Sequence, residues 1–517
     1  MSSTSATTAW SRWSPLLMVV ALALLFDRLF WDRSVGLNLT LFALAAMAVA
    51  TWRHGWKGIS VPARWATLGT LVAAAMVFVH HSTVAIIATV VGLMLFAGLV
   101  HEPALRSVPF ALPQAVLSLL MAPVAGRQGL ATLRGAGAAP GSGWRWTRIV
   151  IVPVLVALAF VQLYRTGNPK FEQLTAGFFD GLFDLLGELL TPHLLFFLWG
   201  LMVCATLVRR MAPELAARFE QGCTDAMVRV RIRRPHWLAP LAMDALERER
   251  RAGVVLLVLV NLALLVVNAI DIGWVWSGFT VPEDFSLKQF VHEGTWALIC
   301  SIMLSMVVLL YMFRGNLNFH PRNATLKRLA VVWVVQNFIL GISVFLRNYH
   351  YISFHGLAYK RVGVIVFLAL VLIGLVTMFI KVHRRRSLFY LVRVNGWAWF
   401  VVLVGLTTVD WDSLIVRYNL RHDNPGEIDI DNYLHMSDKV LPLLYADLDK
   451  VEHQMARHRN NRVRWVEHLD PAEFRRELDE KRGRFLQRYA GLHWQEYSWA
   501  DHRTMAALKE AGLNVRP

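Results

Sequence analysis

Carboxylates and imidazoles near the ends of apolar runs are the side chains of this sequence best suited to chemistry. Glu293, His355, Asp410 and Asp412 are the convenient candidates, because a carboxyl or imidazole group with a shifted pKa in a cleft can act as a general acid or base. The sequence contains no GxxxxGK[ST] phosphate loop, GxGxxG turn, HExxH or CxxC pair, or GxSxG elbow. We therefore predict no catalytic residue, no cofactor and no metal site, and favour a protein that is not an enzyme.

A second group of polar side chains lies inside apolar runs, where polar groups are costly and often functional. The group consists of Asn261, Asn268 and Asp271 in one run and Gln336 and Asn337 in another. Seven residues make about two helical turns, so the first three share one helical face. They could line a path for a substrate or proton, or they could form interhelical hydrogen bonds, worth about 0.6 to 2 kcal/mol each. We favour the hydrogen bonds, because Asp271 lies near the end of its run.

The elements that position these residues are transmembrane helices. Of 517 residues, 56% are hydrophobic and only 17% are charged, which is more apolar than a soluble chain of this length needs. A crossing helix needs about 17 to 25 apolar residues, and about eleven runs meet or approach that length. The runs are residues 15–31, 37–52, 65–81, 83–100, 149–165, 192–208, 252–273, 295–313, 329–346, 362–380 and 394–410. The predicted fold is an all-α polytopic transmembrane helix bundle spanning residues 1–410.

Basic residues indicate how these runs are threaded. The net charge is +17, but residues 411–517 hold 17 Lys and Arg against 18 Asp and Glu, so the excess lies in residues 1–410. It falls in loops between apolar runs, as the positive-inside rule expects, and does not indicate nucleic acid as a partner. With eleven spans the basic loops share one side, the N-terminus is cytoplasmic and residues 411–517 are extracytoplasmic. The expected location is a cytoplasmic membrane, with the basic loops on its cytoplasmic side.

Three segments of the first 410 residues need separate interpretation. Residues 108–124 contain three prolines and are predicted to form a re-entrant or interfacial helix, with a kinked true span as the alternative. The cytoplasmic loop 209–251 has ten Arg against six acidic residues and is expected to attract anionic lipid headgroups. The basic residues from Arg347 to Arg361 are placed in an outer loop, where we favour solvation over contact with an anionic headgroup.

Residues 411–517 are predicted to form a small α-helical domain outside the membrane. Asp470 followed by Pro471 is a strong helix-start signal, and Ser498 is a weaker one. Gly512 is a plausible helix stop. Because the domain is helical, of mixed charge and free of Cys, we expect it to serve as an interaction module, with an envelope protein as the partner.

Three motifs resemble those of a bacterial family of uncharacterised inner-membrane proteins, a domain of unknown function of the 4173 or 4153 type. One motif comprises Phe290, His292, Glu293 and Gly294, and a second comprises Tyr351, Ile352, Gly356, Leu357 and Arg361. The third comprises Ile415, Arg417, Asn419, Leu420, Asp431, Tyr433, Leu434, Ser437, Asp438, Pro442 and Leu443. The resemblance covers roughly residues 15 to 445. It implies a shared multi-span fold without an established substrate, cofactor or catalytic residue. The chain departs from the family at Lys439 and Leu441, where small residues are usual.

The motifs and the end of the last run define a candidate polar cluster at the outer membrane face. Its members are Glu293, Arg361, Asp412, Arg417, Asn419, Asp431, Tyr433 and Asp438. The cluster could bind a lipid headgroup or envelope precursor, or it could clamp the C-terminal domain onto the bundle, which we favour. A non-enzymatic membrane scaffold or sensor is the preferred function. A transporter of an envelope-related or lipid-like solute and an envelope enzyme acting on a lipid-linked substrate are the alternatives.

Overall fold

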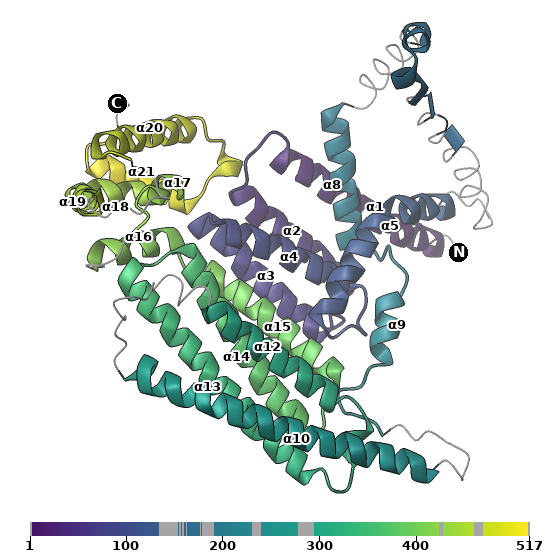
Figure 1. Ribbon diagram of the computed structural model, residues 1–517. Helices are drawn as coiled ribbons and strands as arrows, with labels where there is room; N and C mark the ends of the chain where they lie inside the picture. Colours follow the sequence, from purple (N-terminus) through teal and green to yellow (C-terminus); the bar gives the residue numbers. More distant parts are fainter. Residues whose placement is uncertain are drawn as a thin grey trace. The chain divides into compact units, whose positions relative to one another are not determined.

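Helices make up nearly all the regular structure in a computed structural model of the protein (Figure 1). The structure describes residues 3–133, 191–229, 239–277, 294–422, 428–459 and 469–514, and part of 153–177. Within these ranges there is no β-strand, and the one antiparallel bridge joins Ala226 to Arg386. The predicted all-α class is confirmed. The chain divides into two compact units.

The first unit comprises Met1–Leu71, Thr89–Pro103 and Ala111–Ala216. In it α1 (Ser3–Phe30), α2 (Leu37–His54) and α8 (Pro192–Val208) pack against one another. The unit also holds most of α5 (Val108–Leu133) and parts of α3 (Val61–His80) and α4 (Thr83–Val100). Helix α8 approaches α1 closely because Gly200 faces Phe26, and a Cβ at Gly200 would lie 2.4 Å from the Phe26 ring. Small residues at helix contacts are typical of membrane bundles.

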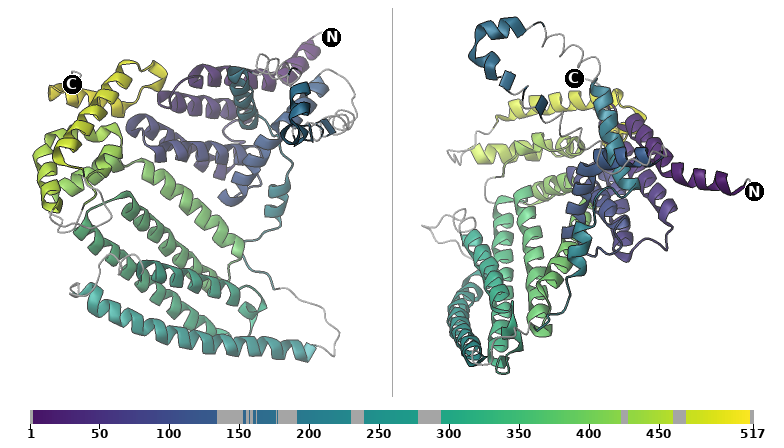
Figure 2. Two further views of the ribbon diagram at one scale, coloured as in Figure 1. Left: turned by 45° about the horizontal axis from the view of Figure 1, so that its top comes forward. Right: turned by 90° about the vertical axis from the view of Figure 1, so that its right-hand side faces the viewer.

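The second unit comprises Val72–Ala88, Ala104–Phe110 and Ala217–Pro517. Its long helices are α10 (Ala239–Asp271), α12 (Thr295–Met312), α13 (Ala324–His355), α14 (Tyr359–Arg384) and α15 (Leu388–Thr407). Helix α13 packs against α10, α12 and α14, and α14 packs against α15, an arrangement visible from two further directions in Figure 2. Shorter elements are α9 (Leu215–Gln221), which begins at the unit boundary, the π-helix η2 (Ile272–Trp276) and the 3-10 helix η4 (Asn316–Phe319).

The C-terminal helices gather at one end of the long helices of the second unit (Figures 1 and 2). They are α16 (Trp411–Arg421), α17 (Asn432–His435), η5 (Asp438–Val440), α18 (Leu441–Ala446), α19 (Leu448–Arg459), α20 (Pro471–Ala490), η6 (Trp494–Glu496) and α21 (Trp499–Glu510). They share a hydrophobic core that includes Tyr433, Phe474 and Phe485, none more than 1% exposed. This core gives the C-terminal helices their own burial of apolar surface.

The predicted helix signals of the C-terminal segment are confirmed. Helix α20 begins at Pro471, directly after Asp470. Helix α21 begins after Ser498, whose hydroxyl accepts a hydrogen bond from the Asp501 N–H at 3.1 Å, satisfying one of the free donors of the first turn. Gly512 follows α21 with φ +69°, the left-handed conformation in which glycine is favoured.

Seven helices of the described residues are long and apolar enough to cross a membrane, so the protein is an integral membrane protein. They are α3, α4, the helix from Leu246 to Trp276, α12, α13, α14 and α15, and each coincides with a predicted run. The runs 15–31 and 37–52 lie within α1 and α2, and 192–208 is the 17-residue α8. Run 149–165 lies largely outside the described residues. Residues 108–124 form the first part of α5, which contains Pro113 and Pro123.

Candidate functional site

Asp410, Asp412 and Lys439 form a buried charge cluster where α16 begins. Lys439 Nζ lies 2.9 Å from Asp410 Oδ1 and 3.2 Å from Asp412 Oδ2, and the lysine side chain is 7% exposed. The Ser413 hydroxyl donates to Asp410 Oδ2 at 2.8 Å, and the Ser437 hydroxyl donates to Asp412 Oδ2 at 2.5 Å. One cation therefore serves two carboxylates, and both carboxylates also accept hydroxyl hydrogen bonds. Buried charges in proteins are paired in this way because an unpaired one is costly.

Asn419 of α16 binds the backbone of the turn between α13 and α14. Its Oδ1 accepts from the Leu357 N–H at 2.6 Å, and its Nδ2 donates to the Leu357 carbonyl at 2.9 Å. Gly356, the preceding residue, has φ +80°, and a Cβ there would lie 2.6 Å from Asn419 Oδ1. The turn therefore needs glycine for both its conformation and the close approach of Asn419. Asn419 ties the C-terminal helices to the bundle.

Arg361 stabilises the same turn from the first turn of α14. Its guanidinium donates to the carbonyl of His355 at 2.8 Å and to the carbonyl of Gly356. The guanidinium carbon also lies 4.7 Å from the centroid of the Tyr351 ring, within range of a cation–π contact. Arg361 thus satisfies carbonyl groups at the end of α13, as basic residues commonly do.

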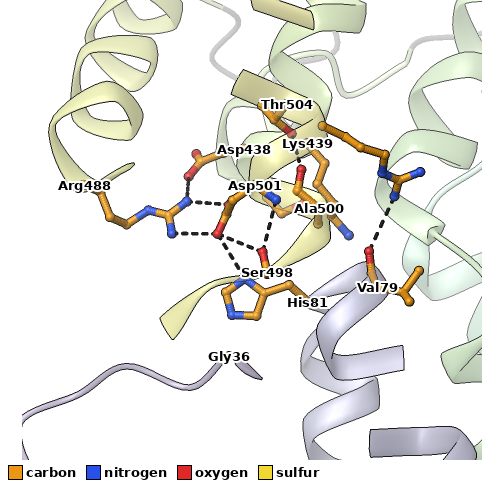
Figure 3. Close-up of polar contacts among 12 residues, drawn as sticks. Gly36, Val79, His81, Asp438, Lys439, Arg488, Ser498, Ala500, Asp501 and Thr504 are labelled. Atoms are coloured by element: carbon orange, nitrogen blue, oxygen red, sulfur yellow. Dashed lines mark hydrogen bonds and ion pairs between the residues drawn. The ribbon is translucent and has the colours of Figure 1, made fainter. Parts of the chain in front are cut away.

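A second charge cluster joins α20 and α21 to η5 (Figure 3). The Arg488 guanidinium contacts Asp501 Oδ1 and Asp438 Oδ2, each at 2.9 Å, and its other terminal nitrogen donates to Asp501 Oδ2 at 3.2 Å. The Ser498 hydroxyl donates to Asp501 Oδ2 at 3.0 Å, and His81 Nδ1 lies 3.7 Å from the same oxygen. Burial raises the pKa of Asp501, but the hydrogen bonds and charge of Arg488, then His81 and Ser498, outweigh it and hold the pKa below its usual value.

Tyr433, Asp431 and Lys481 hold the short helix α17 in place. Tyr433 is 1% exposed in the core of the C-terminal helices, and burial raises the pKa of its hydroxyl. Asp431 Oδ2 accepts from the Leu469 N–H at 3.2 Å. Lys481 donates to the carbonyls of Leu434, at 2.8 Å, and Met436, and burial lowers the pKa of Lys481. These three side chains are engaged inside the fold.

The structure brings four of the eight residues of the predicted outer cluster into three sets of contacts. Asp412 joins the Lys439 cluster, Asp438 joins the Arg488 cluster, and Asn419 and Arg361 meet at the turn after α13. Arg417 is exposed and lines a pocket beside Lys439. Glu293 lies outside the described residues. Sequence reasoning missed Arg488 and Asp501, and for Lys439 the available signal was a charged residue where the resembling family has small ones.

The intramembrane polar residues lie between α10 and α13. Gln336 Nε2 donates to Asn261 Oδ1 at 2.8 Å, and Asn268 Nδ2 donates to the Gln336 carbonyl at 3.0 Å. Asn337 instead donates to the Trp333 carbonyl of its own helix at 2.8 Å. Three of the polar residues therefore link the two helices by hydrogen bonds, as polar residues in membrane bundles commonly do.

Asp271 has a partner that the sequence interpretation misplaced. Arg347 Nη2 lies 2.5 Å from Asp271 Oδ1, and Arg347 is only 8% exposed. The expectation that Arg347 lies in a solvated outer loop is wrong, because α13 continues to His355 and carries Arg347 against α10. An ion pair buried at this depth offsets much of the cost of removing both charges from water.

No group of three or more His, Cys, Asp or Glu side chains in the described part of the chain is arranged to hold a metal ion. A family model, the domain of unknown function DUF4153, matches residues 13–446. The chain belongs to this family. The match confirms the resemblance and its extent, and shows that the family is of the 4153 type and not the 4173 type. No curated protein and no solved structure matches the chain. Arg488 and Asp501 lie beyond the match, whereas Gly356, Asn419 and Lys439 lie within it.

Proposed function

We propose that this DUF4153 protein is a non-enzymatic scaffold or sensor of the bacterial inner membrane, whose C-terminal helices bind an envelope protein. The observation that carries the proposal is the internal pairing of the candidate site residues. Asp412, Asn419 and Asp438 each contact other groups of the protein. Asn419 fastens α16 to the turn between α13 and α14, and the other two pairs hold α16 and α20 to η5. A catalytic or transport site would need such groups to face a substrate.

The proposal includes eleven spans, a cytoplasmic N-terminus and an extracytoplasmic C-terminus, with residues 108–124 not crossing. A single cysteine at Asn514, with Cys204, Cys223 and Cys300 replaced by alanine, tests this threading. We expect a membrane-impermeant maleimide to label N514C in spheroplasts without permeabilisation. A cysteine at Glu249, in the basic loop, serves as the control and should be labelled only after permeabilisation. Labelling of E249C alone in intact spheroplasts would overturn the threading.

The exposed face of α20 is the proposed binding surface for an envelope protein. It has a shallow hollow lined by Ala472, Arg476, Glu480, Gly483 and Arg484, a mixed-charge lining suited to a polar protein surface. A photocrosslinking amino acid at Arg476 or Gly483 should give one and the same discrete protein adduct in cells, and the same probe at Asn514 should not. The proposal fails if neither position gives an adduct and the purified protein turns over or transports a lipid-linked substrate.

The basic loop 209–251 is proposed to contact anionic lipid headgroups on the cytoplasmic side. Several of its described arginines already have acidic neighbours, as Arg210 does with Glu102 and Glu214, both at 2.8 Å. Arg251 pairs with Glu247 at 2.9 Å. The attraction to headgroups would therefore come from the remaining arginines of the loop, by about 1 kcal/mol for each one near the surface. Salt-dependent retention of phosphatidylglycerol by the purified protein would test it.

A further inference from the structure

A pocket of about 190 Å³ lies among α16, η5, α18 and α21. Its charged lining residues are Arg417, Lys439, Arg503 and one carboxylate, Asp410, and its hydroxyl residues are Ser413 and Thr504. The three basic residues come from three different elements, so the fold and not a local sequence run assembles the charge. The pocket belongs entirely to the second compact unit.

The positive charge of the pocket is only partly neutralised. Lys439 is shared by Asp410 and Asp412, so these three groups together carry one negative charge, and Arg417 and Arg503 bring the sum to +1. Arg417 and Arg503 are exposed, and among the described residues neither has a carboxylate within ion-pair distance. Arg503 makes one long contact, 3.5 Å from its Nη2 to the Val79 carbonyl. Two guanidinium groups therefore keep most of their donors available at one pocket.

The hydroxyl groups of the pocket do not serve as hydrogen-bond donors to a ligand. Ser413 donates its hydrogen to Asp410, and Thr504 donates its hydrogen to the Ala500 carbonyl at 2.9 Å. Donors for a ligand must therefore come from the two arginines. The planar guanidinium fork matches two oxygens of a phosphate at once, so the pocket favours a phosphate group over a single-point anion.

The pocket lies beside the ends of two helices that are long and apolar enough to cross a membrane. Val79 lies in the last turn of α3, and His80 Nε2 lies 3.2 Å from the carbonyl of Thr408, the residue after α15. Both α3 and α15 are apolar helices of crossing length. Leu414 and Trp499, next to the pocket in sequence, are each 42% exposed, and exposed tryptophan is typical of the membrane–water interface.

We infer that the Arg417–Arg503 pocket binds the phosphate of an anionic membrane lipid. The lipid's chains would continue into the bilayer beside α3 and α15 while its phosphate contacts both guanidinium groups. This site is separate from the proposed scaffold function, since it concerns neither α20 nor its partner. Loss of the lipid would leave the crosslinks at Arg476 and Gly483 unchanged.

Native mass spectrometry of the full-length protein, released from nanodiscs of phosphatidylglycerol and phosphatidylcholine, tests the inference. We expect a retained phosphatidylglycerol adduct whose affinity falls at least about tenfold in R417Q/R503Q, the loss of about 1.4 kcal/mol. The matched control is R476Q/R484Q on α20, which removes the same charge from two arginines that pair with Glu473 and Glu480. The control should retain the adduct. Equal loss in both variants would show a general charge effect and overturn the site.

Two further experiments test whether the guanidinium groups are required and whether the ligand is a lipid or free phosphate. R417K/R503K preserves the charge but not the fork, so it should fold as the wild type does and bind with intermediate affinity. If it binds as tightly as the wild type, guanidinium recognition is refuted. In the second experiment, inorganic phosphate is added to the lipid-free protein in detergent together with a guanidine-modifying reagent. If phosphate alone protects Arg417 and Arg503 from modification, the site binds free phosphate and not a lipid.

Discussion

Replacing Asn419 by alanine removes both hydrogen bonds between α16 and Leu357. Asn419 is 1% exposed, and its amide serves the N–H and the carbonyl of one residue at 2.6 and 2.9 Å. A buried backbone group left without a partner costs about 1–3 kcal/mol. Leu357 is half-buried, so water can reach it in part, and the lower half of that range applies to each group. We therefore expect N419A to destabilise the contact by about 2–4 kcal/mol.

Hydrogen exchange at the Leu357 amide measures this effect directly, because that hydrogen is the one donated to Asn419. At about 1.4 kcal/mol for each tenfold, its exchange should quicken by roughly 30- to 700-fold in full-length N419A. Amides of α16 should also lose protection, since α16 is held to the turn by the same side chain.

Two variants separate the hydrogen bonds from other effects of the substitution. N419D has nearly the same volume and can still accept from the Leu357 N–H. Its second carboxylate oxygen, however, would face the Leu357 carbonyl oxygen and bury an unpaired negative charge, so we expect it to lose at least as much protection as N419A. N514A, at an exposed position near the C-terminus, should change nothing. Leu357 exchange in N419A within threefold of the wild-type rate would refute the reasoning.

Three further substitutions follow from the same contacts. G356A should destabilise the wild type by about 1–3 kcal/mol from backbone strain alone, because φ +80° with ψ 179° is a conformation essentially restricted to glycine. The 2.6 Å approach to Asn419 adds to this cost. Thermal unfolding should show a smaller effect of G356A in the N419A background, and strictly additive effects would contradict the contact. K439M leaves Asp410 and Asp412 without their cation and should reduce the free energy of unfolding by about 3–5 kcal/mol. The control K450M breaks the exposed pair with Asp447 and should reduce it by only about 0–1 kcal/mol. Equal melting temperatures for the two variants would rule out a buried cluster. The folded-state pKa of Asp501 is depressed, so its contribution to stability is complete above the unfolded pKa of about 3.9 and is lost as the pH falls through the folded pKa. Hydrogen exchange in α21 measured from pH 6 to pH 3 should therefore show a loss of protection that D501N lacks. Identical pH profiles for both proteins would contradict this prediction.

Sequence reasoning located the helices of the bundle well, because long apolar runs have few alternatives in a membrane. All seven helices of crossing length coincide with predicted runs, and the starts of α20 and α21 follow from Asp470–Pro471 and Ser498. These are local properties: hydropathy over about 20 residues and free backbone donors within one helical turn. The shared face of Asn261 and Asn268 was also readable from helical periodicity, whereas their contacts with Gln336 of another helix were not.

The pairing of charges required the tertiary structure. Asp271 and Arg347 are far apart in the sequence, and the interpretation of Arg347 as solvated failed because nothing local shows where α13 ends. Arg488 reaches Asp438 and Asp501 only because α20 and α21 fold back over η5. Composition and periodicity thus determine that this chain enters the membrane and where its helices lie. Which polar side chains are neutralised within the fold, and which, like Arg417 and Arg503, remain available to a ligand, depends on contacts between residues distant in the sequence, and only the folded chain decides those.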